Sequence, residues 1–193
     1  MNTYPVLDLY RTNSHDVIGS RSFSSNSKIV SKIGDIFIDK FHKNRIGTII
    51  KHIPGHGHSN ADSHHKLPII NKSIKYLNTH DFKAFKNKKS LFSMTAHIIY
   101  SQIDPINSAT HSKKMIRLIR DKLLFKNLIM SDDISMKALK FNILKNTKLA
   151  FTAGCNLVLH CNGKLCDIKK IYPYVISLKK KYYHYFLNDM LNL

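Results

Sequence analysis

The sequence predicts an α/β protein in which parallel strands alternate with helices. Five short runs of apolar or β-branched residues are continuous rather than alternating, as strands buried on both faces are. These runs cover residues 4–9, 46–51, 91–99, 128–131 and 156–160. Helical patterns lie between the runs, and strands that alternate with helices are typical of βαβ units and a parallel sheet.

The expected helices follow from apolar residues that recur every four positions. One such series is Ile29, Ile33, Phe37 and Phe41, and another is Met115, Ile119 and Leu123. Residues 143–153 also suit a helix, and Gly154 follows as the expected stop, because glycine readily adopts the left-handed conformation that ends helices.

Each apolar run is followed, or ended, by a titratable side chain. These are Asp8, then Lys51 and His52, then His97, then Asp132 and Asp133, then His160. In α/β folds the ligand site lies at the carboxyl ends of the strands. Strand ends are often polar for no functional reason, but five that deliver acids and bases indicate an active site at one rim of the sheet.

Size and composition bound the class of protein. The chain has 193 residues, of which 43% are hydrophobic, enough for one domain with a core but short of the roughly 250 residues of a closed (β/α)₈ barrel. No run of roughly 18 apolar residues predicts a membrane span, and the first residues lack the pattern of a secretory signal. Three cysteines without a CxxC spacing favour a reducing cytoplasm over a disulfide framework.

The net charge of +19 has two interpretations. Clustered lysines could neutralise nucleic-acid phosphates, and the lysine runs at 86–89 and 179–181, the second beside tyrosines, are the places for it. The alternative is compositional bias, since lysine, asparagine and isoleucine abound together. The even spread of charge along the chain favours compositional bias and argues against nucleic-acid binding.

The chain contains no glutamate, so any catalytic carboxylate is an aspartate. Asp132 follows an apolar run and is expected to project from a strand end, where an ionised carboxylate can attack an electrophilic carbon or stabilise a cation. Because side chains alternate along a strand, Asp132 and Asp133 are expected to point to opposite faces. A helix cap is the other interpretation of such a pair.

A histidine-rich segment, residues 51–68, holds the second candidate group. Asp62 precedes His64 by two residues, so its carboxylate could hydrogen-bond one ring nitrogen and leave the other to give and take a proton near neutral pH. The neighbouring histidines His52, His56, His58 and His65 raise the possibility of a metal site. The absence of an HExxH spacing argues against it, and we expect neither a metal nor a cofactor.

Several segments in one order carry a family resemblance. KHIPGHG and ADSHHKLP, then MTAHIIYSQIDP, then MSDDISMKAL resemble the cytosolic bacterial β-N-acetylglucosaminidases of glycoside hydrolase family 3. PVLDL and IGSRSF extend the resemblance upstream, and AGCNLVLHCN extends it downstream. It covers residues 5 to 162.

The resemblance implies a TIM-barrel-like (β/α)₈ fold and an enzyme that removes terminal β-linked N-acetylglucosamine with retention. It implies that Asp132 is the nucleophile, His64 the acid/base and Asp62 the dyad partner of that histidine. Arg21, Lys51 and His52 match sugar-binding positions. The implied substrates are muropeptide fragments of peptidoglycan recycling, in the cytoplasm, without a metal or cofactor.

The resemblance also implies an incomplete barrel. Residues 4–9 match a strand well inside the family's domain, so residues 1–193 are expected to form a single partial domain that lacks the N-terminal strands. A parallel sheet without its neighbours exposes backbone and apolar faces. We therefore expect either a complementary N-terminal fragment as partner, or an inactive remnant that acts as a basic binding or structural protein.

Overall fold

The computed structural model describes residues 1–12, 18–58, 67–175, 184, 187, 188 and 190. Its centre is a parallel sheet of β1 (Ile49–Ile53), β3 (Phe92–Thr95), β5 (Leu128–Asp133) and β6 (Leu157–Leu159), in the order β1-β3-β5-β6. A second parallel pair joins β2 (Ile69–Ile70) to β4 (Ile99–Tyr100). The predicted α/β class with parallel strands is confirmed.

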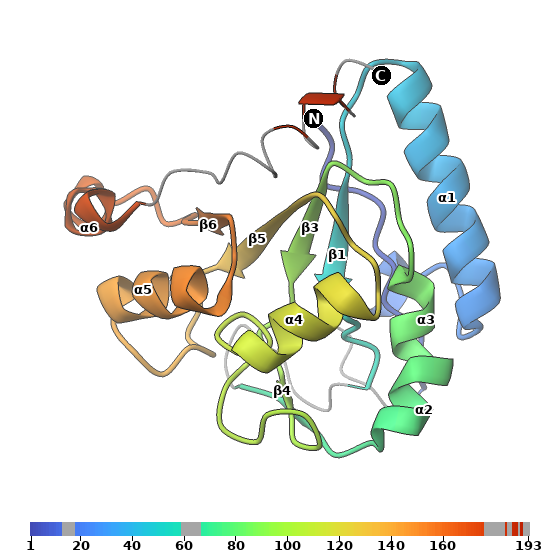
Figure 1. The fold of residues 1–193 in the computed structure, drawn as a ribbon, viewed down its shortest axis with the longest axis horizontal. Coiled ribbons are helices and arrows are strands. Elements are labelled where there is room, and N and C mark those ends of the chain that lie inside the picture. The colour runs from blue at the N-terminus through green and yellow to red at the C-terminus, as the bar shows by residue number, and fades with distance from the viewer. Residues whose placement is uncertain (13–17, 59–66, 176–183, 185–186, 189, 191–193) are drawn as a thin grey trace.

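The helices follow the strands in βαβ order. They are α1 (Ser27–Lys43), α2 (Ile74–Thr79), α3 (Asp81–Phe85), α4 (Lys113–Asp121), α5 (Ile143–Ala153) and α6 (Leu165–Ile171), with 3₁₀ turns at Gly19–Arg21 and Tyr172–Tyr174. In Figure 1, α1 runs along one side of the sheet, and α6 lies at the opposite end, beyond β6. No helix in the described part of the chain is both long and apolar enough to cross a membrane.

The predicted strand at residues 4–9 does not form a regular strand, so this prediction is wrong. This segment makes isolated parallel bridges to β1 and the residue before it, Asn2 with Thr48 and Val6 with Lys51. The amide of Leu7 donates to the carbonyl of Lys51 at 2.8 Å, and the amide of Lys51 donates to the carbonyl of Pro5 at 3.3 Å. Pro5 has no amide hydrogen, which interrupts the ladder. The segment nevertheless lies where a strand beside β1 would lie.

Two other expected strands changed their bounds. The apolar run at 91–99 splits into β3 and β4, which belong to different sheets. The run at 46–51 becomes β1 three residues later, because Arg45 has a positive φ and residues before Thr48 form a turn. Continuous apolar runs give no internal mark of where pairing starts or stops.

Helix α5 has the predicted bounds, and its caps show why. The Asn142 side chain accepts from the amide of Lys145, and Gly154 ends the helix with φ 117°. Helix α1 has the predicted four-residue period, but its buried face is shifted by one residue from the predicted series. Val30, Gly34 and Ile38 are buried, whereas Ile29 is 48% exposed. An added Cβ at Gly34 would lie 2.5 Å from a methyl group of Leu7, so α1 packs on that side.

Alternate residues of the strands build two separate apolar clusters. Ile50 and Ile129 belong to the large cluster that the helices cover, whereas Ile49, Leu128 and Met130 belong to a smaller cluster on the other face of the sheet. We call this second face the inner face. Since side chains alternate, Asp132 falls on the inner face with Leu128 and Met130, at the carboxyl end of β5.

Strand β1 departs from this alternation at its carboxyl end. Its pairing with β3 shifts in register between Lys51 and Ile53. Ile50 and Ile53 both pack in the helix-covered cluster although they are three residues apart. The irregularity therefore frees the two intervening residues, Lys51 and His52, to lie together at the rim.

Candidate active site at the strand ends

The carboxylate of Asp132 lies at the inner rim and is only partly shielded from solvent. Its side chain is 18% exposed. The amide of Asp133 donates to Asp132 Oδ1 at 2.8 Å. Burial raises the pKa of Asp132, but His52, His97 and this hydrogen bond outweigh it, so the pKa lies below its ordinary value. Asp132 is therefore an ionised carboxylate at neutral pH.

The imidazole of His52 lies between two carboxylates. Its Nδ1 is 2.7 Å from Asp8 Oδ2, and its Nε2 is 3.9 Å from Asp132 Oδ2. Asp8 is fully buried, while the His52 side chain is 10% exposed. Burial raises the pKa of Asp8, but His52 and His56 outweigh it and leave the pKa below its ordinary value. The structure thus brings together three of the titratable side chains that the sequence places at strand ends, namely Asp8, His52 and Asp132.

Lys51 brings a cationic group to the same rim. Burial and then the nearby Arg21 guanidinium lower the pKa of Lys51, while Asp132 and Asp8 oppose that shift. Its Nζ also lies 5.8 Å from the centre of the Tyr4 ring. Arg21 ends the 3₁₀ turn Gly19–Arg21. Four of the six predicted site residues, Arg21, Lys51, His52 and Asp132, therefore interact electrostatically around one place.

The other two predicted residues, Asp62 and His64, lie outside the described residues. The structure does describe the segment that leads to them. The amide of His56 donates to Asp8 Oδ1 at 2.6 Å, and an added Cβ at Gly57 would lie 2.5 Å from the carbonyl oxygen of Leu9. This segment is therefore pressed against the chain around Asp8.

Asp81 contacts the same segment through His58. Its carboxylate is buried and lies 3.5 Å from His58 Nε2 and 3.8 Å from the Arg11 guanidinium. Burial raises the pKa of Asp81 to about 6 although Arg11 opposes it. Burial, Arg11 and Lys72 lower the pKa of His58 to about 4.

The carboxylate of Asp133 bonds a different set of groups from that of Asp132. Its carboxylate accepts from the amide and hydroxyl of Ser135 and from the amide of Cys161. It thereby ties the turn after β5 to the end of β6. Of the pair, only Asp132 faces the inner rim, and Asp133 stabilises the connection behind it.

His97 belongs to the rim, whereas His160 departs from it. His97 is buried: Nε2 donates to the carbonyl of Asp133 at 3.0 Å, and Nδ1 contacts Thr110 Oγ1 at 2.7 Å. The Nε2 atom of His160 instead lies 3.9 Å from Asp167 Oδ2 on α6. The sequence places Asp8 and His97 at expected strand ends and His56 among the candidate metal ligands, but it does not predict the contacts that join them, because those contacts are tertiary.

In the ranges that the structure describes, no group of three or more His, Cys or Asp side chains is arranged to hold a metal ion. His64 and His65 lie outside those ranges.

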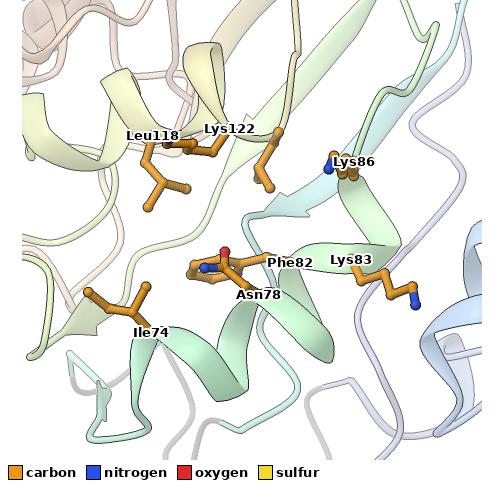
Figure 2. Close-up of a pocket in the computed structure, with 8 residues that line it drawn as sticks. Ile74, Asn78, Phe82, Lys83, Lys86, Leu118 and Lys122 are labelled. Atoms are coloured by element: carbon orange, nitrogen blue, oxygen red, sulfur yellow. The ribbon is translucent and has the colours of Figure 1, made fainter.

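A separate cavity of about 330 Å³ lies between α2, α3 and α4. Its lining is apolar with lysines around it, as Figure 2 shows, and consists of Ile74, Asn78, Phe82, Lys83, Lys86, Leu118, Lys122 and Leu123. In that view Lys83 extends away from Phe82 and Leu118. The cavity shares no residue with the rim. With 31 Lys and Arg in the chain, lysines beside a surface hollow are expected from composition.

A parallel sheet with helices outside, and acids and bases at the carboxyl ends of its strands, defines the class of barrel enzymes whose sites lie at that rim. The family model described as the glycosyl hydrolase family 3 N-terminal domain matches residues 1–183. The chain belongs to this family. The predicted family and the incomplete TIM-barrel-like fold are thereby confirmed.

Curated relatives agree. A β-hexosaminidase of Haemophilus influenzae is 39% identical over 170 residues, which is 83% of this chain and 47% of the relative. A β-hexosaminidase of Idiomarina loihiensis is 35% identical over 164 residues, 83% of this chain and 49% of the relative. The chain thus spans about half the length of the curated relatives it matches.

Solved structures extend the comparison to the fold. NagZ from Neisseria gonorrhoeae, in complex with N-trifluoroacetyl-D-glucosamine, has a TM-score of 0.84 at 29% identity, covering 97% of this chain and 55% of NagZ. A family 3 β-N-acetylglucosaminidase from a Paenibacillus strain has a TM-score of 0.86, covering 98% of this chain and 38% of that protein. Its 24% identity supports the fold alone.

Proposed function

We propose that this chain carries the catalytic rim of a retaining exo-β-N-acetylglucosaminidase. The observation that carries the proposal is the position of His52 between Asp8 and Asp132, with Lys51 and Arg21 beside them. The β-hexosaminidase names of the relatives and the N-trifluoroacetyl-D-glucosamine in NagZ support an N-acetylated amino sugar as the group bound there.

Asp132 is the proposed nucleophile. It is ionised, partly exposed and on the inner face, so its Oδ2 can attack the anomeric carbon and form a covalent glycosyl-enzyme. His64 protonates the glycosidic oxygen as that bond breaks, and then takes a proton from the water that releases the sugar. Asp62 polarises His64. These two roles rest on the family resemblance.

The cationic and imidazole groups at the rim are proposed to hold the sugar. Lys51 and Arg21 donate hydrogen bonds to sugar hydroxyls, and His52 contacts the same ring. Both groups act as hydrogen-bond donors and do not compete for the proton of the leaving group.

The proposed natural substrates are muropeptide fragments that arise from peptidoglycan turnover in the cytoplasm. Because the chain spans about half of its curated relatives, we further propose that turnover needs a complementary polypeptide that supplies the N-terminal strands. The second candidate is an inactive remnant with a binding or structural role, which the same shortened span and the charge of +19 favour.

Hydrolysis of p-nitrophenyl β-N-acetylglucosaminide tests the proposal. We expect release of p-nitrophenol by the chain alone or after addition of the N-terminal strands of the Haemophilus influenzae relative, with the β anomer as the first product. Asp132→Asn is the matched control and should abolish release without changing the circular dichroism spectrum. An Asp132→Asn variant that keeps its rate contradicts the assignment. No release under either condition favours the remnant.

A further inference from the structure

Both oxygens of the Asp8 carboxylate accept hydrogen bonds from groups of the catalytic rim. The amide of His52 donates to Oδ1 at 3.2 Å and to Oδ2 at 3.1 Å, and Oδ2 is also 2.7 Å from His52 Nδ1. Oδ1 accepts from the amide of His56 at 2.6 Å. Asp8 has no exposed surface, so its carboxylate bonds groups inside the protein rather than solvent.

These contacts determine which nitrogen of His52 carries the proton. An ionised carboxylate only accepts hydrogen bonds, so Nδ1 must be the donor. In a neutral imidazole, Nε2 then has a free lone pair and acts as an acceptor. The other tautomer would place a nitrogen lone pair 2.7 Å from a buried carboxylate oxygen, with no hydrogen between them.

The orientation of His52 adds a second consequence. Its Nε2 is 3.9 Å from Asp132 Oδ2, too far for a hydrogen bond between the two. Neither acceptor satisfies the other, so each can take a hydrogen bond from a bound ligand, and a hydroxyl group can donate its proton to Nε2. A sugar presents such hydroxyls on every side of the ring.

We propose that Asp8 is a positioning residue that holds His52 as the Nδ1–H tautomer, so that Nε2 accepts a hydroxyl proton from the sugar bound beside Asp132. The identity of the ligand rests on the proposed function, whereas the tautomer does not. Through the amide of His56, the same carboxylate also holds the segment that leads to residues 59–66. Asp8 thereby joins His52 to the described part of the histidine-rich segment, at His56.

The first test uses the unmutated protein without substrate. Nitrogen-15 NMR of the imidazole rings at about pH 8, above the usual histidine pKa of about 6.5, reports the tautomer directly. We expect a protonated Nδ1 and an unprotonated Nε2 for His52, assigned by its loss in His52→Gln. A protonated Nε2 overturns the proposal, whether or not the chain hydrolyses any substrate.

The second test compares Asp8→Asn with Asp104→Asn. Asp104 is a suitable match because its carboxylate also accepts several hydrogen bonds, from Ser112 and Asn107, but in a loop outside the rim cluster. We expect Asp8→Asn to mix the His52 tautomers and weaken N-acetylglucosamine binding about tenfold, as loss of one hydrogen bond to a charged group does. Asp104→Asn should change neither signal.

The outcomes separate this inference from the proposed function. Binding of N-acetylglucosamine is measured by NMR titration, so it needs no turnover. An unchanged tautomer and affinity in a folded Asp8→Asn variant overturns the positioning role even if the chain is active. In an active preparation, a KM increase that exceeds the kcat decrease supports it. If Asp8→Asn does not fold, the tautomer of the unmutated protein decides.

Discussion

Asp132 Oδ2 lies 3.9 Å from His52 Nε2, although the two residues belong to strands that are separated in the sheet by β3. Asp132 reaches the inner rim by the ordinary alternation of β5. His52 reaches it through the register shift at the end of β1. A regular β1 would have placed either Lys51 or His52 at the rim, and the irregularity gives the site both.

Substitutions of the neighbouring residues Asp132 and Asp133 should have different effects, the first on activity and the second on stability. We expect Asp133→Asn to lower the free energy of unfolding by about 1–3 kcal/mol, because its carboxylate accepts bonds from Ser135 and Cys161. Asp132→Asn removes no such connection and should leave stability near that of the parent while lowering kcat by more than about 1000-fold. Urea unfolding and the p-nitrophenyl assay measure the two effects. Equal stability losses in both variants would contradict this division.

His64→Ala should impair catalysis in proportion to the need for a proton on the leaving group. For an alkyl N-acetylglucosaminide we expect a loss of about 100- to 10,000-fold in glycosylation, the usual contribution of a general acid. A dinitrophenyl leaving group departs without protonation, so glycosylation should be largely restored there. Pre-steady-state release of the phenol measures this step. Equal losses for both substrates count against an acid role.

Gly57→Ala should disturb the segment that leads to Asp62 and His64. Its Cβ would lie 2.5 Å from the carbonyl oxygen of Leu9 and 3.0 Å from Asp81 Oδ1. We expect a stability loss of about 1–3 kcal/mol, as for other overpacked positions, and a lower kcat. Gly47→Ala is the control, because the nearest atom to its Cβ would be a methyl group at the end of the Leu91 side chain, at 2.7 Å, rather than a backbone atom. Thermal unfolding and the hydrolysis assay compare them.

The buried histidines should make the fold sensitive to mild acid. Burial, as the largest cause, lowers the pKa of His56, His58 and His111 to about 4 from the ordinary histidine value of 6.5. Between those values the unfolded chain binds more protons than the folded one, so the stability that these neutral rings contribute is lost as pH falls. His56, which is buried, contributes a slope of up to about 1.4 kcal/mol per pH unit, and the partly exposed His58 and His111 contribute less because solvent screens them.

The pKa shift of Asp81 has the opposite effect on the pH dependence of stability. Its pKa is raised to about 6 from 3.8, so over that interval the folded state binds more protons and stability falls as pH rises. Three histidines against one aspartate leave a net loss of stability on acidification. Urea unfolding at about pH 7 and about pH 5 measures it. His111→Gln should reduce the difference, and no change on mutation would contradict the assignment.

Much of the fold and half of the rim could be predicted from local patterns. Continuous apolar runs indicated the strands, and Gly154 correctly predicted where α5 ends. Alternation placed Asp132 on the same face as Leu128 and Met130. The strand at 4–9 was wrong because a single proline removes a ladder donor, an effect that overall β propensity does not register.

The sequence by itself determined the family, the α/β class, the chemical types at the strand ends and the absence of any glutamate from the site. These follow from residue order and short-range periodicity, which are local properties of the chain. Only the tertiary structure decided that Asp8 bonds His52, that β1 brings both Lys51 and His52 to the rim, and that His160 turns to Asp167. Each of these depends on register and on contacts between segments that are distant in sequence, and no local pattern encodes them.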